Sequence, residues 1–349
     1  MTHFPRYDPT RTYDWNYQHF PDPVDWDIPA VPQSWTFLGL PVSSPLGIPA
    51  GPLLNGGWCR YYASLGFDVL TYKTVRSGER ECYPLPNLQP IASDSLGGNE
   101  KLVPATATMQ GSWAVSFGMP SKSPTVWRAD VEKTRKLLPP DKRLVVSVVA
   151  TEQAGWSIDD LAADYARCAR WAVESGADAI ELNFSCPNVA TCDGQLYQDT
   201  TNTRLVLQSV RAVISQVPLV VKIGYLAQVD KAAALVAAVA GLANGLSMVN
   251  CIATRVAKDS EQLLFDGAPR GIAGEAIRDA SLAQVAMFRD VIRQANAPLQ
   301  IIGVGGIFTT QHVMNYLEQG AASVQLATAA MLDPTVGVRI RKELAGFSY

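Results

Sequence analysis

The sequence contains few of the residues that bind transition metals or iron–sulfur clusters. It has only three histidines, His3, His19 and His312, and its six cysteines form no CxxC pair. Thiolate zinc sites and iron–sulfur clusters need several such ligands in one place. The composition therefore argues against either kind of site within this chain, and we predict no metal ligand.

No stretch of the sequence is long and apolar enough to predict a membrane-spanning helix. The longest apolar run, AAALVAAVAGLA from Ala232, is well short of the roughly 20 residues that a spanning helix needs. The first residues also lack the basic region and the apolar region of a secretory signal. These features predict a cytoplasmic protein with no membrane partner.

The sequence also lacks an excess of charge of either sign. Its 349 residues include 29 basic and 32 acidic ones, a formal net charge of −3. A balance of this kind gives no reason to expect nucleic acid or an anionic membrane as a partner. The hydrophobic fraction of 48% is enough for a large core that does not depend on disulfides. We therefore expect a small-molecule ligand.

Short apolar runs alternate along the chain with longer amphipathic segments, a pattern typical of α/β proteins. Apolar runs with little internal alternation indicate strands that are buried on both faces, as in a parallel sheet. Ser157 with Asp160 resembles a capping box and predicts the start of one of the helices. We predict strands within residues 45–51, 68–75, 144–150, 179–185, 218–224, 245–251, 299–306 and 323–329.

Eight strands that each begin a β/α step match the number in a closed TIM (β/α)8 barrel. An open, doubly wound sheet is the alternative, but it would need a G-x-G-x-x-G fingerprint after its first strand. The sequence there, PAGPLLNGG, does not match. We predict an α/β protein whose residues 37–349 form one catalytic TIM barrel.

Two segments do not fit a minimal barrel. Residues 1–36 are rich in proline, tryptophan and tyrosine and predict an extended arm on the surface. Residues 76–128 form a long insertion after the second strand, and so long a connection is usually a functional lid or an inserted substructure. Either segment could contribute to a substrate pocket or a subunit interface.

Polar residues stand at the carboxyl ends of the predicted strands, where barrel enzymes have their active sites. Taken singly, a lysine there is usually a solvated strand end, an asparagine caps a loop, and a cysteine is a small buried hydrophobe. A barrel brings these strand ends around one opening, which favours a site. The residues at these strand ends are Lys73, Asn183, Cys186, Lys222, Asn250, Cys251, Gly305, Gly306 and Thr328. We interpret the other cysteines as structural: Cys59, Cys82, Cys168 and Cys192.

Glycine-rich segments follow the last strands. GVGGI (303–307) and the later QLATAA lie where TIM barrels often bind phosphate, and GIAG (271–274) predicts a further glycine loop after strand six. These segments suggest a phosphorylated ligand such as FMN. A lysine beside a flavin would stabilise the negative charge of its reduced form.

These motifs resemble the dihydroorotate dehydrogenase family and the pyrimidine domain of dihydropyrimidine dehydrogenases. The resemblance extends from about residue 37 to about residue 345. The most specific match is ELNFSCPN (181–188). Further matches are SPLGIPAG (44–51), YKT (72–74), VVKI (220–223), VNC (249–251), GIAG (271–274) and IIGVGGI (301–307).

The resemblance implies an FMN-dependent enzyme that oxidises a dihydropyrimidine. Cys186 would remove a proton from the saturated ring while hydride passes to flavin N5, and a cysteine there is typical of the soluble class 1 enzymes. A thiol with a pKa near 8.5 can exchange protons without a histidine partner. Lys73 and Lys222 match the flavin lysines. Asn183, Asn188, Asn250 and Cys251 match positions around the substrate, and Ala50, Gly51, Gly274, Gly305, Gly306 and Thr328 match flavin contacts.

One position departs from the family pattern. Val115, in VSFGMPS, stands where relatives that oxidise dihydroorotate have an asparagine. The sequence therefore leaves two possibilities for the substrate: dihydroorotate, or else dihydrouracil, dihydrothymine or a specialised metabolite.

Two other classes of function are considered. One is a hydrolase with Cys186 as nucleophile, which lacks a nearby histidine base. The other is a barrel that binds a phosphorylated ligand without catalysis. The resemblance also implies a homodimer, and reoxidation by a small acceptor or by a separate electron-transfer partner.

Overall fold

Eight parallel strands close into a barrel in the computed structural model, which describes residues 4–185, 192–259 and 262–346. Neighbouring strands pair in the order β10, β11, β14, β15, β3, β4, β8, β9 and back to β10. Each of the eight predicted runs overlaps one of these strands, and β8 begins one residue earlier than predicted, so the prediction of a TIM barrel is confirmed. The strands are β3 (Leu46–Ile48), β4 (Val69–Val75), β8 (Arg143–Val148), β9 (Ala179–Asn183), β10 (Leu219–Lys222), β11 (Gly245–Met248), β14 (Gln300–Val304) and β15 (Ser323–Gln325).

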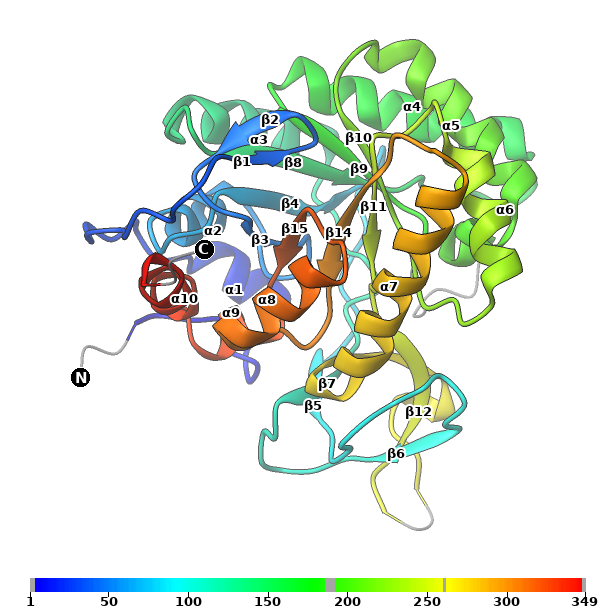
Figure 1. The fold of residues 1–349 in the computed structure, drawn as a ribbon. Helices are drawn as coiled ribbons and strands as arrows, with labels where there is room; N and C mark the ends of the chain where they lie inside the picture. The colour runs from blue at the N-terminus through cyan, green and yellow to red at the C-terminus, as the bar shows by residue number, and fades with distance from the viewer. Residues whose placement is uncertain (1–3, 186–191, 260–261, 347–349) are drawn as a thin grey trace.

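Helices connect successive strands and cover the outside of the barrel (Figure 1). The Ser157 hydroxyl accepts from the backbone of Asp160 and the Asp160 side chain accepts from the backbone of Ser157, so the predicted capping box is present. No helix in the described ranges is long and apolar enough to cross a membrane. The helices are α2 (Gly56–Ala63), α3 (Pro124–Leu137), α4 (Ile158–Glu174), α5 (Thr200–Ile214), α6 (Val229–Val239), α7 (Arg278–Gln294), α8 (Thr310–Glu318), α9 (Thr328–Leu332) and α10 (Val336–Ala345).

A short hairpin closes the amino-terminal end of the barrel. It consists of β1 (Trp35–Phe37) and β2 (Leu40–Val42), which pair antiparallel. Burial of the hairpin's apolar side chains against the inward-facing residues of the barrel strands removes both from water. The cluster contains Phe37, Leu38, Val42, Val69, Val145, Ala179, Val220, Ile302 and Val304.

A second sheet, called the roof sheet here, covers the opposite end of the barrel. Figure 1 shows its strands below the barrel, away from the β1–β2 hairpin. Two separate connections build it, one after β4 and one after β11. Its strands run in the order β5 (Leu88–Pro90), β7 (Ser112–Val115), β13 (Arg270–Gly274), β12 (Ile252–Ala257) and β6 (Leu102–Pro104).

The roof sheet corrects one prediction and refines another. Residues 271–274 were expected to form a glycine loop, but they belong to β13, which pairs with β7 on one side and with β12 on the other. Pairing on both sides satisfies the backbone of β13 and outweighs the low strand propensity of glycine. The insertion predicted at residues 76–128 contains β5, β6 and β7, so it is an inserted substructure rather than a bare loop.

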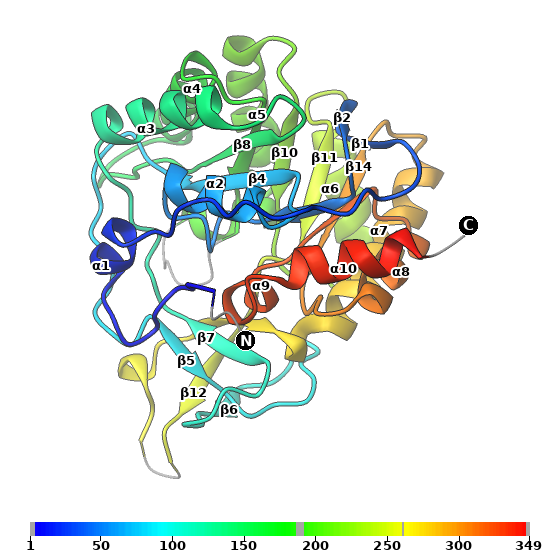
Figure 2. The same ribbon diagram turned by 90° about the vertical axis from the view of Figure 1, so that its left-hand side faces the viewer.

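The N-terminal arm, residues 4–34, lies across the outside of the barrel (Figure 2). Within it, α1 (Tyr13–Gln18) is a short helix capped by the Thr12 hydroxyl. Side chains of the barrel helices hold its backbone. The Tyr61 hydroxyl donates to the carbonyl of Pro5 at 2.7 Å, and Arg341 donates to the carbonyl of Pro29 at 3.0 Å.

A buried ion network joins the start of β4 to the last helix. Asp68 is fully buried and accepts from Lys142, just before β8, and from Arg341 in α10. Arg341 also donates to the carbonyl of Gly66 at 2.7 Å. A carboxylate in such a place is stable only when its charge is compensated.

We expect the Asp68→Asn substitution to lower the free energy of unfolding by about 3 to 5 kcal/mol, because it leaves two buried cations without their carboxylate. Urea denaturation would measure the loss. The matched control is Asp290→Asn, since Asp290 pairs with Arg289 and Arg293 on the surface and should lose at most about 1 kcal/mol. Equal losses in the two variants would contradict the importance of the network.

Candidate active site

Two adjoining cavities lie between the carboxyl ends of the barrel strands and the roof sheet. The first has a volume of about 870 Å³, part of which opens to solvent, and the second about 310 Å³. The two cavities share the lining residues Asn250, Ala273, Val304, Ala327 and Thr328.

Every predicted site residue within the described ranges lines one of these cavities. Asn250 and Thr328 line both. Cys186 and Asn188 lie outside the described residues. The first cavity is lined by Ala50, Gly51, Lys73, Asn183, Lys222 and Cys251, and the second by Gly274, Gly305 and Gly306.

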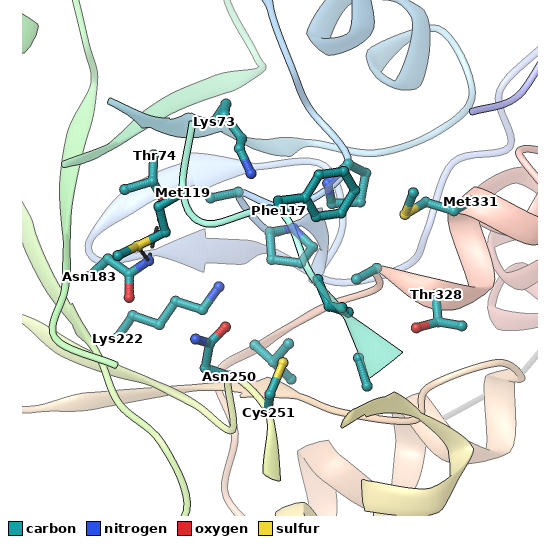
Figure 3. Close-up of a pocket in the computed structure, with 18 of the residues that line it drawn as sticks. Lys73, Thr74, Phe117, Met119, Asn183, Lys222, Asn250, Cys251, Thr328 and Met331 are labelled. Atoms are coloured by element: carbon teal, nitrogen blue, oxygen red, sulfur yellow. Dashed lines mark hydrogen bonds between the residues drawn. The ribbon is translucent and has the colours of Figure 1, made fainter. Parts of the chain in front are cut away.

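Two buried lysines face the first cavity. Lys73, in β4, is 7% exposed and Lys222, the last residue of β10, is 5% exposed. Their amine ends both point toward the open middle of Figure 3. The Lys73 ammonium lies 5.1 Å from the centre of the Phe117 ring. A buried cation is stable only when polar or electron-rich groups surround it, and a negative or electron-rich ligand in the cavity would add such a group.

Asn183 and Asn250 hold the backbone that leads to Cys186. The Asn183 side-chain oxygen accepts from the Ser185 backbone N–H at 3.2 Å, and the Asn250 amide donates to the Ser185 carbonyl. Asn183 also donates to the Thr74 hydroxyl at 3.3 Å. An amide side chain has two donor hydrogens and an acceptor oxygen with two lone pairs. These contacts therefore fix the orientation of both amides and leave capacity for a ligand.

Glycines at the second cavity let backbone come close to backbone. Gly306 has φ +62°, and a methyl group there would lie 2.5 Å from Cβ of Arg278 and 3.0 Å from the carbonyl oxygen of Gly274. Gly274 itself has φ +106°, which side chains rarely tolerate. The Tyr316 hydroxyl donates to the Gly305 carbonyl at 2.7 Å and fixes the turn. The result is a concave cradle of main chain, suited to a phosphate group.

Burial raises the pKa of three of the thiols that we interpret as structural. It raises the pKa of Cys82 to about 11, although the nearby Lys73 partly opposes this shift. It also raises the pKa values of Cys59 and Cys168 well above the usual range of a thiol. These three thiols stay protonated at neutral pH, in agreement with their structural interpretation.

Several lining residues were not predicted from the sequence. Thr74 could have been found, because it directly follows Lys73 at the strand end, and its hydroxyl lies 3.0 Å from that of Ser147. Phe117 and Met119 lie in the stretch that contains Val115. No sequence signal points to the others, since the roof sheet and α9 supply them: Leu88, Trp113 and Met331.

A closed parallel barrel with a cavity of strand-end lysines and asparagines defines a TIM-barrel enzyme. The family model for dihydroorotate dehydrogenase matches residues 34–347, and the chain belongs to this family. Its members are oxidoreductases that act on a carbon–carbon single bond, and this protein is therefore an enzyme of that class. The family assignment agrees with the resemblance seen in the sequence motifs.

Individual relatives support the assignment over different lengths. A dihydroorotate dehydrogenase of Dictyostelium discoideum is 31% identical over 330 residues, 87% of this chain and 86% of that protein. A dihydroorotate dehydrogenase B (NAD(+)) catalytic subunit of Staphylococcus carnosus is 32% identical over 167 residues, 48% of this chain and 52% of the subunit. A dihydroorotate dehydrogenase A (fumarate) of Limosilactobacillus reuteri is 32% identical over 201 residues, 56% of this chain and 61% of that protein.

A solved structure matches the fold. The crystal structure of the dihydroorotate dehydrogenase of Eimeria tenella in complex with ferulenol superposes with a TM-score of 0.72. The match covers 95% of this chain and 88% of the other, at 19% sequence identity. At that identity the likeness shows a common fold.

We expect Gly274→Ala to lower the free energy of unfolding by at least about 3 kcal/mol. The reason is that a methyl group there would lie 2.1 Å from the Gly111 carbonyl oxygen. The control is Gly155→Ala, which also has a positive φ, +84°, but has nothing within 4 Å of the new methyl group. Backbone strain alone should cost the control about 1 kcal/mol. Urea denaturation of both variants would show whether the steric contact causes the larger loss of stability. Equal losses of unfolding free energy would refute the importance of this contact.

Proposed function

We propose that this protein is an FMN-dependent dihydroorotate dehydrogenase that oxidises dihydroorotate to orotate. The main support is one arrangement: two buried lysines and two asparagines face a cavity that adjoins a glycine cradle, in a chain of this family. The reaction removes a proton and a hydride from neighbouring ring carbons. A base, a hydride acceptor and amide groups that orient the ring are therefore required.

The residues around the two cavities fit FMN. The cradle at Gly305 and Gly306 suits the phosphate, while Lys73 and Lys222 suit the electron-rich end of a flavin ring. Gly51 leaves open space on the cavity side, because a methyl group there would have nothing within 4 Å. When bound, FMN supplies the hydride acceptor. Ala50, Gly274 and Thr328 complete the proposed cofactor contacts.

Cys186 is the proposed base. Support comes from Ser185, the residue before it, which is hydrogen-bonded to Asn183 and Asn250, and both of these line the first cavity. A thiol with an ordinary pKa near 8.5 can release its proton near neutral pH and then accept the proton from the substrate ring. Asn183, Asn188 and Asn250 are the proposed partners of the ring amides, with Cys251 beside them.

A second candidate substrate is a dihydropyrimidine without a carboxylate, such as dihydrouracil or dihydrothymine. Val115 favours it, because this residue lines an apolar wall of the first cavity with Leu88, Trp113, Phe117 and Met119. Placing a carboxylate against such a wall removes its hydration without giving a hydrogen-bond donor in return. Lys73, at the same cavity, favours a carboxylate, so the two candidates need a direct comparison.

Reoxidation by a small acceptor or by a separate electron-transfer partner completes the proposed cycle. The names of two relatives include fumarate and NAD(+), and these are the first acceptors to test. We also propose a homodimer, which size-exclusion chromatography with light scattering would detect.

The purified protein should be yellow with bound FMN, and substrate should bleach it under anaerobic conditions. Cys186→Ala should keep the colour and slow the bleaching by at least about 100-fold, because the proton-transfer step loses its base. Stopped-flow absorbance measures both, with Cys192→Ala as a control in the same stretch of chain. A colourless protein would exclude the flavin enzyme, and unimpaired bleaching in Cys186→Ala would refute the base.

Val115→Asn should raise kcat/KM for dihydroorotate by about tenfold relative to dihydrouracil, since a new donor to the carboxylate contributes about 1.5 kcal/mol. Val115→Thr is the control, because it has a similar volume and a hydroxyl in place of the longer amide. Steady-state rates with both substrates measure the ratio. If the unmodified protein oxidises dihydroorotate alone and Val115→Asn changes nothing, Val115 does not select the substrate.

A further inference from the structure

Tyr13 of the N-terminal arm lies next to Lys73, and Tyr7 of the arm packs on Phe117, which also faces this lysine. Tyr7 and Tyr13 belong to the part of the chain that precedes the family match at residue 34. Both are almost fully buried, at 3% and 4% exposed. An arm that only covered the surface would not need to bury a tyrosine beside a lysine of the cavity.

Two rings face the Lys73 ammonium. Its nitrogen lies 5.1 Å from the centre of the Phe117 ring and 6.0 Å from that of Tyr13. A cation within about 6 Å of an aromatic face is attracted by the negative face of the ring. Figure 3 shows the amine end of Lys73 beside Phe117 at the cavity. Both rings therefore lie within reach of the ammonium.

The rings also support one another. Tyr13 meets Phe117 edge to face, with centroids 6.3 Å apart and planes at 70°. Tyr7 meets Phe117 in the same way, at 5.9 Å and 83°. Edge-to-face pairs are a favourable geometry for aromatic rings. Phe117 comes from the chain after β7, so the arm and the roof sheet meet at this cluster.

Strong hydrogen bonds fix the position of α1. The Asn55 amide donates to the carbonyl of Tyr17 at 2.6 Å, while its oxygen accepts from the Trp58 backbone and caps α2. The Trp58 indole donates to the carbonyl of Asn16 at 3.0 Å. The helix that presents Tyr13 is therefore attached to the first helix of the barrel.

The same connection holds the backbone of Lys73. The Lys73 N–H donates to the carbonyl of Leu53 at 2.8 Å, close in sequence to Asn55. The lysine and the arm are thus both attached to the connection between β3 and α2. The lysine and α1 are therefore linked through a short stretch of chain.

We propose that Tyr13, supported by Tyr7 and Phe117, is a positioning residue that orients the Lys73 ammonium at the first cavity. The N-terminal arm is then part of the active site. The proposal rests on the proposed function only for the identity of the group that the lysine meets, FMN. The alternative is that Tyr13 only packs against the barrel.

Acetylation of Lys73 tests the orientation without reference to catalysis. Full-length protein stripped of flavin would be treated with acetic anhydride at fixed pH, and mass spectrometry would follow each lysine. Tyr13→Leu keeps an apolar side chain but removes the ring, so acetylation of Lys73 should accelerate about fivefold. Lys222, which faces the same cavity from β10, should react at an unchanged rate and serves as the internal reference.

Two variants separate the ring from the rest of the helix. Tyr13→Phe keeps the ring and should restore the slow rate of Lys73. Trp15→Leu removes an aromatic side chain from the solvent-facing side of α1, where Trp15 stacks on His19, and should also leave the rate unchanged. If Tyr13→Leu does not fold, Phe117→Leu removes the nearer ring and should accelerate acetylation in the same way.

The affinity for FMN gives the second measurement. Quenching of FMN fluorescence should show a dissociation constant about fivefold higher for Tyr13→Leu and unchanged for Tyr13→Phe. An unchanged Lys73 rate, or equal acceleration of Lys73 and Lys222, would overturn the positioning role. A faster Lys73 with unchanged FMN affinity would overturn the place of the arm in the site. If the unmodified protein does not bind FMN, the proposed function fails while acetylation still decides the positioning role.

Discussion

The register of the closed barrel is the constraint on which the rest of the structure depends. Strand β10 pairs on both sides, with Lys222 opposite Asn183 in β9 and opposite Ser247 in β11. Successive side chains of a strand point to opposite faces, so a shift by one residue would turn Lys222 out of the barrel. The lysines and asparagines therefore meet at one cavity because eight short strands close in a single register.

The sequence predicted those parts of the fold and site that local patterns encode. Each barrel strand is a short apolar run, and the polar residues at its end, such as Lys73 and Asn250, stand out against it. The roof sheet could not be predicted, because β13 is stabilised by pairing with β7, far away in the sequence. The glycines in residues 271–274 predict a loop, and only pairing with the distant strand β7 makes this segment a strand. Likewise, nothing local indicates that Tyr13 reaches Lys73.

The cavity combines two kinds of segment. The barrel strands supply the residues proposed for chemistry, including Lys73, Lys222 and the asparagines. The roof sheet and the chain that follows β7 supply the apolar wall around Val115 and Phe117, opposite the strand ends. Under the proposed function, the wall can change the preferred substrate while the barrel keeps the reaction. The departure from the family pattern at Val115 lies in the wall and not in the barrel.

The attachment of the arm has a consequence for the order in which the molecule assembles. Arg6 donates to the carbonyl of Leu332, 326 residues further along the chain, and Pro29 accepts from Arg341, 312 residues away. Contacts of such separation close late, because the intervening chain must be made and folded before they can form. Arg6 and Pro29 are synthesised long before α9 and α10, yet these two contacts form only when those helices are in place. The final attachment of an early segment thus waits for the end of the chain.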